Sequence, residues 1–303
     1  MLRITQHRKK FFVFSGLLMG LSLAAWLAWG LKPGIDFTGG SMMEIDYGAS
    51  ARPSAQAVAA TADKALGLSD VTVQPLGTNS MVLRMPPIDE TAHQKLFAEL
   101  KTASASSTAV TEARFESIGP VIGDELRKMT IYAVFAAILA IVLYITYVFR
   151  KVSYPVASWK YGIATIVALC HDVIIPVGVF SALGHFRGVE VGAWMVTALL
   201  TVLGFSVHDT IVVFDRIREN LAQARREGFE DVVNRSMNET LGRSLNTSLT
   251  VLLVLLATYF LGGETIRDFI LTMIIGIAAG TYSSIFVASP LLVSWQLHDS
   301  KRR

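Results

Sequence analysis

The amino-acid sequence predicts an integral membrane protein of six transmembrane helices, with one α+β domain inserted between the first two. Hydrophobic residues make up 52% of the 303 residues and charged residues only 17%, which is too apolar for ordinary soluble domains. Six apolar runs each reach about twenty residues, the length a helix needs to cross a hydrocarbon core. A long polar segment after the first run alternates strand and helix patterns, which predicts a folded domain there.

The first apolar run, residues 11–30, follows a basic segment, residues 1–10, and this combination also describes a secretory signal. The run is longer than the roughly 7–15 apolar residues of a signal peptide. No convincing small-residue cleavage site precedes Lys32. We therefore expect a retained transmembrane helix.

The α+β domain is expected over residues 31–126, in the order strand, helix, strand, strand, helix, strand. A hairpin turn is predicted at Gly77-Thr78-Asn79, and Pro86 is expected to end the strand that follows. Pro53 is expected in the first turn of the first helix. The order is that of the split βαβ, ferredoxin-like arrangement, a fold that hosts many functions. The predicted strands are residues 42–47, 71–76, 80–85 and 110–116, and the predicted helices are residues 53–66 and 89–102.

The remaining five transmembrane helices are predicted within residues 127–293. Loops on the cytoplasmic side are enriched in Lys and Arg, so the flanking basic residues place both termini, including the tail 294–303, in the cytoplasm. Apolar positions at helical spacing at about 216–242 predict an amphipathic helix on the cytoplasmic surface, with a solvated connector as the alternative. The predicted runs are residues 128–149, 157–182, 191–214, 245–262 and 268–293, and the basic residues are Lys9, Lys10, Arg150, Lys151, Arg216, Arg218, Arg225, Arg226, Lys301, Arg302 and Arg303.

Two aspartates lie inside apolar runs, where an ionised carboxylate costs a few kcal/mol and needs a partner or a proton. Asp209 lies near the charged end of the fourth run, and Asp172 lies closer to the middle of the third. In the fifth span Arg243, Asn246 or Thr247, and Thr250 share one helix face, so we expect this face to turn inward, toward a neighbouring helix or a water-filled crevice, and to offer Arg243 as a partner. The alternative is structural: buried Asp and Arg side chains only tie helices together.

A histidine precedes each of these aspartates, His171 and His208. Proton relay is one interpretation, and a hydrogen-bonded packing residue is the commoner one, since neighbours in sequence point to different faces of a helix. Pro176 predicts a kink in the third run. In the sixth run a small residue recurs at every fourth position, which predicts close helix packing. These residues are Thr272, Gly276, Gly280 and Ser284.

Several classes of function lack their motifs in this sequence. No GxxxxGK[ST] loop, GxSxG elbow or HExxH helix occurs, so nucleotide hydrolysis and the common hydrolytic mechanisms are not expected. Six scattered histidines argue against a metal site, and the single cysteine, Cys170, cannot form an internal disulfide. The basic residues lie in short clusters beside apolar runs, so nucleic-acid binding is not expected either. We expect a non-enzymatic protein without a cofactor.

Four motifs resemble the SecD/SecF family of protein-export membrane proteins, a branch of the RND superfamily, and the resemblance to its SecF half covers nearly the whole chain. They are GIDFTGG at residues 34–40, ESIGPVIG at 116–123, HDV at 171–173 and DTIVVFDRIREN at 209–220. The resemblance matches Asp209 and Arg243 to an aspartate and an arginine of the family's proton pathway. Asp172 and His208 are further candidates for that pathway, and His208 stands where similar sequences commonly have asparagine.

The resemblance also implies partners, a location and a function. A six-span half with one external domain implies a second six-span subunit, SecD, with the SecYEG translocon, YajC and a translocating preprotein as further partners. It implies a bacterial inner membrane location with the α+β domain in the periplasm. The implied function is to promote preprotein translocation and release, with the proton-motive force as the energy source. Two alternatives stay open: an RND-type exporter of small molecules or lipids, and a passive scaffold of the translocon.

Overall fold

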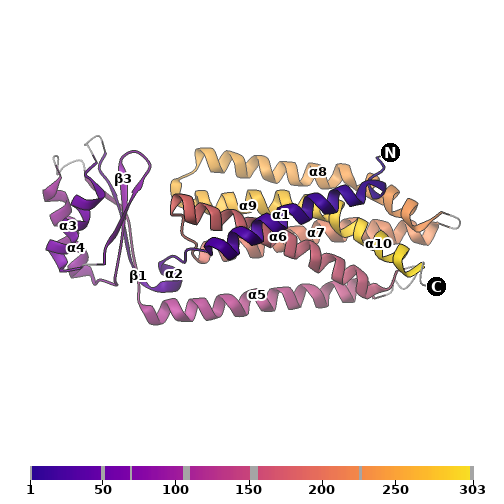
Figure 1. Cartoon of the computed structure of the whole chain (residues 1–303), viewed down its shortest axis with the longest axis horizontal. Coiled ribbons are helices and arrows are strands. Elements are labelled where there is room, and N and C mark those ends of the chain that lie inside the picture. Colours follow the sequence, from indigo (N-terminus) through magenta and orange to yellow (C-terminus); the bar gives the residue numbers. More distant parts are fainter. Residues whose placement is uncertain are drawn as a thin grey trace. The chain divides into compact units, whose positions relative to one another are not determined.

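The computed structural model describes residues 2–48, 52–68, 70–104, 110–150, 156–224 and 227–300. The chain divides into two compact units, which are Pro33–Ile131 and a helical unit made of Met1–Lys32 and Tyr132–Arg303. Figure 1 shows the sheet and its two helices in the first unit and the long helices of the second. Some of the basic residues on which the predicted orientation depends lie outside the described residues, namely Lys151, Arg225, Arg226, Lys301, Arg302 and Arg303.

The prediction of six transmembrane helices is confirmed. Among the described residues, six helices are long and apolar enough to cross a membrane. Most of them extend beyond the predicted apolar runs, because polar residues continue the helix on either side of the apolar part. They are α1 (Arg8–Trp29) with the 3₁₀ turn η1 (Thr5–His7) before it, α5 (Pro120–Val148), α6 (Ser158–Arg187), α7 (Ala193–Gln223), α8 (Phe229–Leu261), and α9 (Glu264–Ser283) continued by the π-helical η2 (Ser284–Ala288) and α10 (Ser289–Ser300).

The prediction of a separate amphipathic helix at about 216–242 is wrong. α7 continues to Gln223 and α8 begins at Phe229, so the polar stretch forms the ends of two long helices. Gly228 caps α8 in an extended conformation, and two acidic residues occupy the first turn, where they stabilise the positive end of the helix dipole. The apolar positions that suggested a surface helix instead pack in the main core of the helical unit. Among them are Phe229, Val233 and Met237.

The small residues of the sixth span are buried against α7, as the sequence predicted. A Cβ added at Gly276 would lie 2.5 Å from Val202 Cγ2, and one added at Gly280 would lie 3.0 Å from Ser206 Cβ. α1 and α6 approach equally closely, since a Cβ added at Gly178 would lie 2.4 Å from Ser22 Cα. At each of these crossings only a residue without a side chain lets the helix backbones come so near.

Two prolines interrupt the helical hydrogen-bond ladders. Pro176 in α6 has no N–H to donate to the carbonyl oxygen of Asp172, four residues earlier. Pro290 lies two residues after the end of the π-helical segment η2, and Ser289 Oγ donates to Ser284 O across that segment at 3.2 Å. The kink predicted at Pro176 stays a prediction. Segments of π-helix are frequent at functional sites, and this one begins at Ser284, beside the buried aspartates described below.

The α+β unit has the predicted ferredoxin-like arrangement, an antiparallel sheet in the order β2-β3-β1-β4. The hairpin turn at 77–79 and the end of β3 before Pro86 are confirmed. Pro53 lies outside the first helix, because Ser54 is the N-cap and its Oγ accepts a hydrogen bond from Ala57 N. The elements are α2 (Ile35–Thr38), β1 (Gly40–Asp46), α3 (Ala55–Leu66), β2 (Thr72–Leu76), β3 (Ser80–Met85), α4 (Glu90–Ala103) and β4 (Thr111–Ile118).

The two glycine-rich motifs singled out in the sequence, residues 34–40 and 116–123, meet in this unit. Gly39 has a φ of +71°, and a Cβ added there would lie 2.8 Å from Pro120 Cα. A Cβ added at Gly123 would lie 2.8 Å from Gly39 N. Glycine is required at both positions, because the backbone after α2 lies directly against the first turn of α5.

Candidate functional site

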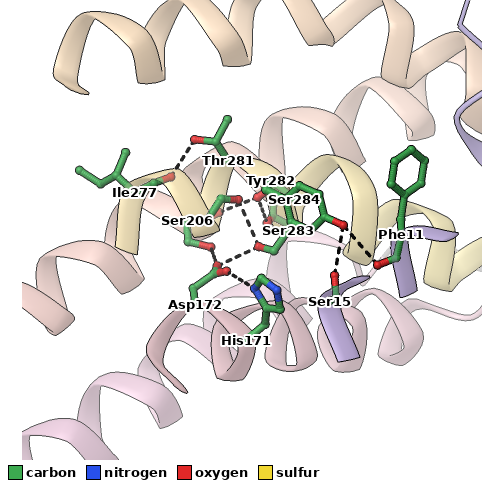
Figure 2. A network of polar contacts seen from close by, with 12 residues as sticks. Phe11, Ser15, His171, Asp172, Ser206, Ile277, Thr281, Tyr282, Ser283 and Ser284 are labelled. Atoms are coloured by element: carbon green, nitrogen blue, oxygen red, sulfur yellow. Dashed lines mark hydrogen bonds and ion pairs between the residues drawn. The ribbon is translucent and has the colours of Figure 1, made fainter. Parts of the chain in front are cut away.

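Asp172 is the centre of a polar cluster between α6, α7 and α9 (Figure 2). Its side chain is 0% exposed. Oδ2 accepts hydrogen bonds from Ser206 Oγ at 2.5 Å and from Ser283 Oγ at 2.9 Å, and Oδ1 lies 2.9 Å from His171 Nδ1. An ionised carboxylate only accepts hydrogen bonds, so these three donors suit the ionised form.

His171 belongs to the same cluster. The expectation that it would point away from Asp172 is wrong, because the imidazole turns back toward the carboxylate of the next residue. Its Nε2 atom is buried and has no hydrogen-bond partner among the described residues. The ring lies 6.0 Å from that of Tyr282, centroid to centroid. Tyr282 Oη donates to Phe11 O at 3.2 Å and accepts from Ser15 Oγ at 3.4 Å, so the cluster extends to α1 (Figure 2).

Asp209 has fewer hydrogen bonds. It lies in α7 and is 6% exposed. Oδ1 accepts a hydrogen bond from Ser244 Oγ of α8 at 2.6 Å, whereas Oδ2 is buried and has no partner among the described residues. Its neighbour Thr210 bonds elsewhere, with Oγ1 2.7 Å from Ser284 Oγ. A single hydroxyl donor is a poor substitute for the hydration of a charged carboxylate.

Arg243 does not contact Asp209 in this structure, and its helix face does not pack against the neighbouring helices of this chain. Arg243, Thr247 and Thr250 are exposed. The buried stripe of α8 is shifted by one residue, because small hydroxyl side chains let α8 approach α7 and α9 where an arginine would not fit. It consists of Ser236, Thr240, Ser244 and Ser248. His208 is exposed as well, on the opposite side of α7 from the core.

Arg243 instead lines a cleft of about 350 Å³ between α7 and α8. Arg216 bridges the cleft, with Nε 2.6 Å from Glu239 Oε2 and NH1 2.7 Å from Glu219 Oε2. The lining also includes Val212, three residues after Asp209 in the sequence of α7. The cleft therefore brings charged groups to within about one helical turn of the buried carboxylate. The cleft could not be predicted from the sequence, because the residues that line it lie on two different helices.

The acidic side chains described above are not arranged as a metal site. Within the described ranges, no group of three or more His, Cys, Asp or Glu side chains is placed to hold a metal ion. The chemistry that the two aspartates offer is the binding and release of protons, together with hydrogen bonds that join α6, α7, α8 and α9.

Comparisons with known proteins agree with these motifs. The family described as Protein export membrane protein SecD/SecF, C-terminal, matches residues 98–298, and the SecD/SecF GG motif matches residues 30–51. Protein translocase subunit SecF of Thermobaculum terrenum is 45% identical over 100% of this chain and 96% of its own length. The corresponding subunit of Anaerolinea thermophila is 40% identical over 98% of this chain and 94% of its own length.

Solved structures show the same fold. The crystal structure of SecDF from Thermus thermophilus, a translocon-associated membrane protein, is 33% identical, with a TM-score of 0.83 over 100% of this chain. A SecDF structure in a super-membrane-facing form gives a TM-score of 0.70 over 99% of the chain, also at 33% identity. This chain spans 39% of each of those longer chains. With its family match covering more than half of its residues and relatives aligned over its whole length, the chain belongs to the SecD/SecF family of protein export membrane proteins.

Proposed function

We propose that this chain is the SecF-type subunit of a Sec protein translocase, and that Asp209 binds and releases the proton whose gradient drives preprotein movement. The observation that carries the proposal is a buried carboxylate with one hydrogen-bond donor and one unpartnered oxygen. Such a carboxylate is costly when ionised in an apolar helix and far less costly when protonated. Gain or loss of its proton therefore changes which arrangement of α7 and α8 is favoured.

Arg243 is the proposed counter-charge for the ionised state. It lines the charged cleft that reaches toward Asp209, without an ion pair to that residue. Movement of the guanidinium toward Asp209 would stabilise the carboxylate, and protonation would remove the attraction. The alternation between these states would couple proton passage to a shift between α7 and α8.

A SecD-type subunit is the proposed partner. A relative named SecDF, from Thermus thermophilus, is 37% identical over 92% of this chain but over only 36% of its own length. The cleft is bordered by outward-facing positions of α7 and α8 that recur at helical spacing. They are His208, Val212 and Asp215 of α7 and Glu239, Arg243 and Asn246 of α8. Lipid tails offer no hydrogen bonds to His208, Arg243 or Asn246, so a partner's helices fit this surface better than lipid does.

Membership of the family also suggests a cellular location, an orientation in the membrane and further partners. We propose a bacterial inner membrane location, with both termini in the cytoplasm and the α+β domain in the periplasm. SecYEG, YajC and the translocating preprotein would be further partners. The basic residues at the ends of the spans support this orientation, because such residues favour the cytoplasmic side.

The central experiment compares Asp209→Asn with Asp231→Asn in membrane vesicles that hold the complete translocase. Asp231 is the control, an exposed acid in the first turn of α8 that does not line the cleft. We expect Asp209→Asn to lose the stimulation of preprotein translocation by a proton gradient, and Asp231→Asn to keep it. Unchanged stimulation in Asp209→Asn would favour the scaffold alternative. Loss of small-molecule or lipid efflux with normal preprotein release would favour the exporter alternative.

The partner surface is tested with two glycines that lie on exposed helix faces. Gly204 of α7 lies one turn before His208, and Gly20 lies in α1; an added Cβ meets no atom within 4 Å at either position. We expect Gly204→Leu to reduce co-purification of a second six-span subunit and Gly20→Leu to leave it unchanged. Equal recovery of that subunit with both variants would contradict the assignment of this surface.

A further inference from the structure

The His171 and Asp172 pair carries an inference that is separate from Asp209. We propose that the pair forms a second proton-binding site, in which Asp172 stays ionised and the imidazole of His171 takes up the proton at Nε2. The step is the binding of one proton from water to a nitrogen lone pair, and no other bond forms or breaks. Figure 2 shows the two side chains facing each other within the polar cluster.

The hydrogen bonds of Asp172 favour its ionised form. Its three partners come from three helices, and two of them are serine hydroxyls that donate to the same oxygen, Oδ2. A protonated carboxyl group would have to donate a hydrogen bond itself, so one of these hydroxyls would have to accept instead; Ser283 Oγ would then donate only to Gly280 O, which lies 3.1 Å away. The carboxylate is therefore the form to which both serine hydroxyls and His171 can donate at once.

His171 is the group that can neutralise this charge. Across the described part of the chain, no lysine or arginine forms an ion pair or hydrogen bond with Asp172 or with His171. A single buried negative charge without a counter-charge is strongly unfavourable, because it has lost its hydration. An imidazolium 2.9 Å from Oδ1 would provide the missing positive charge, so the pair is better suited to hold one proton than none.

The geometry selects the nitrogen. Nδ1 of His171 faces Asp172 Oδ1 and therefore carries a hydrogen in either charge state. Nε2 is buried and has no partner among the described residues, and the side chain is 1% exposed. In the neutral ring Nε2 offers a free lone pair, which is the position left for the incoming proton.

Among the described residues of the surrounding elements, no other titratable side chain is hydrogen-bonded to the pair. Tyr282 of α9 lies closest, but its hydroxyl donates to Phe11 O instead of facing the imidazole. α1 contributes Ser15 and α7 contributes Ser206, neither of which titrates. Cys170 precedes His171 in α6 and is exposed on another face. Asp209 of α7 bonds to Ser244 of α8 and makes no hydrogen bond to His171 or Asp172.

The inference deepens the proposed function and rests on it only for a role in transport; proton binding at His171 does not depend on it. α7 takes part in both proposed proton sites. Ser206 of α7 bonds to Asp172, and Asp209, three residues after Ser206, bonds to Ser244 of α8. Two proton sites of different chemistry on one helix would let a histidine and a carboxylate respond to proton supply separately.

The test follows the histidines of the full-length protein in lipid nanodiscs by ¹⁵N NMR of the imidazole groups as pH is varied. His171→Gln identifies the signal. We expect the neutral ring to carry its hydrogen on Nδ1 and to gain a second hydrogen on Nε2 as pH falls. Asp172→Asn should lower the proton affinity of His171 about tenfold or more, since it removes the opposite charge. His208→Gln, which changes an exposed histidine, should leave the signal of His171 unchanged.

Ser283→Ala is a second variant, and it should change the proton affinity of His171 in the opposite direction. It removes one donor from Oδ2 and keeps the His171 contact, so more negative charge remains on the carboxylate and the proton affinity of His171 should rise. This variant decides the question if Asp172→Asn does not fold. A purely structural role for Asp172 predicts no such opposite shifts.

Three outcomes would overturn the proposal. They are a His171 that stays neutral throughout the pH range in which the protein is folded, a midpoint that neither variant moves, and an infrared carboxylic-acid band from Asp172 on acidification. Asp209→Asn should change the proton affinity of His171 far less than Asp172→Asn does, because Asp209 makes no hydrogen bond to the pair. Loss of proton-driven translocation in Asp209→Asn and titration of His171 are thus separate results, and one can fail without the other.

Discussion

Asp172 and Asp209 are both aspartates buried in membrane-spanning helices, yet they differ in the hydrogen bonds that they receive. Asp172 accepts from two serines and a histidine, and Asp209 accepts from one serine. Burial alone therefore does not distinguish a structural charge from a proton carrier. The number of hydrogen-bond donors distinguishes the two. Protonation stabilises a fully hydrogen-bonded carboxylate little, whereas it stabilises a poorly hydrogen-bonded one much more.

The comparison predicts that removal of the two carboxylates has unequal effects on stability. Asp172→Ala leaves two buried hydroxyls and an imidazole without their acceptor, so we expect a loss of about 3 kcal/mol or more in the free energy of unfolding. Asp209→Ala leaves only Ser244 without an acceptor and should cost about 1 kcal/mol. Reversible unfolding of the purified protein in detergent micelles measures both. Equal losses would remove the distinction between the two sites.

A glycine substitution should disturb the Asp172 site alone. A Cβ at Gly280 would lie 3.0 Å from Ser206 Cβ and 3.4 Å from Asp172 Oδ2, so Gly280→Ala should cost about 1–3 kcal/mol by overpacking. Gly204→Ala in α7 is the control, since its added methyl group meets no atom within 4 Å. Melting temperatures of the two variants give the comparison, and similar values for both would contradict the packing described here.

The single donor of Asp209 should have a smaller effect. Ser244→Ala removes the hydrogen bond to Oδ1 and should cost about 1 kcal/mol of stability. Thr250→Ala, on the exposed face of the same helix, removes only bonds to the helix's own carbonyls and should be close to neutral. A loss in Ser244→Ala as large as that in Asp172→Ala would show that the donor count does not rank the two sites.

The smallest effect is expected in the α+β unit, at a buried polar atom that has no charge at neutral pH. Tyr47 Oη is buried without a partner among the described residues, and burial raises the pKa of this phenol. The unfolded chain then ionises first, so Tyr47 lowers stability as pH rises through its unfolded value of about 10. Tyr47→Phe should be near neutral at pH 7 and should flatten the loss of stability above pH 10, as measured by unfolding in alkaline buffers. A large loss at pH 7 would reveal a hydrogen bond to this hydroxyl.

Much of the fold could be predicted from local patterns. The six transmembrane helices follow from the length of the apolar runs. The order of strands and helices along the α+β unit follows from the alternation of strand patterns with helix patterns. The donors of Asp172 could not be predicted in this way, because Ser206 and Ser283 are 34 and 111 residues away in the sequence. No spacing rule connects residues that distant. The cleft around Arg216 and Glu239 escaped prediction for the same reason.

The outward placement of the Arg243 face escaped prediction for a different physical reason. Helical spacing correctly groups Arg243 with Thr247 and Thr250, but it does not say whether that face meets this chain or another one. The prediction assumed that a polar face turns toward its own bundle, because lipid cannot satisfy it. In this chain the serine stripe containing Ser244 forms the internal contact, and the arginine face is left outward.

The π-helical segment Ser284–Ala288 has a consequence for chain length. Such a segment holds one residue more than an α-helix would place in the same turn. Deletion of any one of its five residues would therefore restore regular α-helical bonding and leave the following helix close to its present rotation about its axis. Insertion of a further residue would instead turn that helix by about 100°. Leu292 and Val293, both fully buried, would then leave the core. We therefore expect the protein to tolerate the loss of one residue in this segment far more readily than the gain of one.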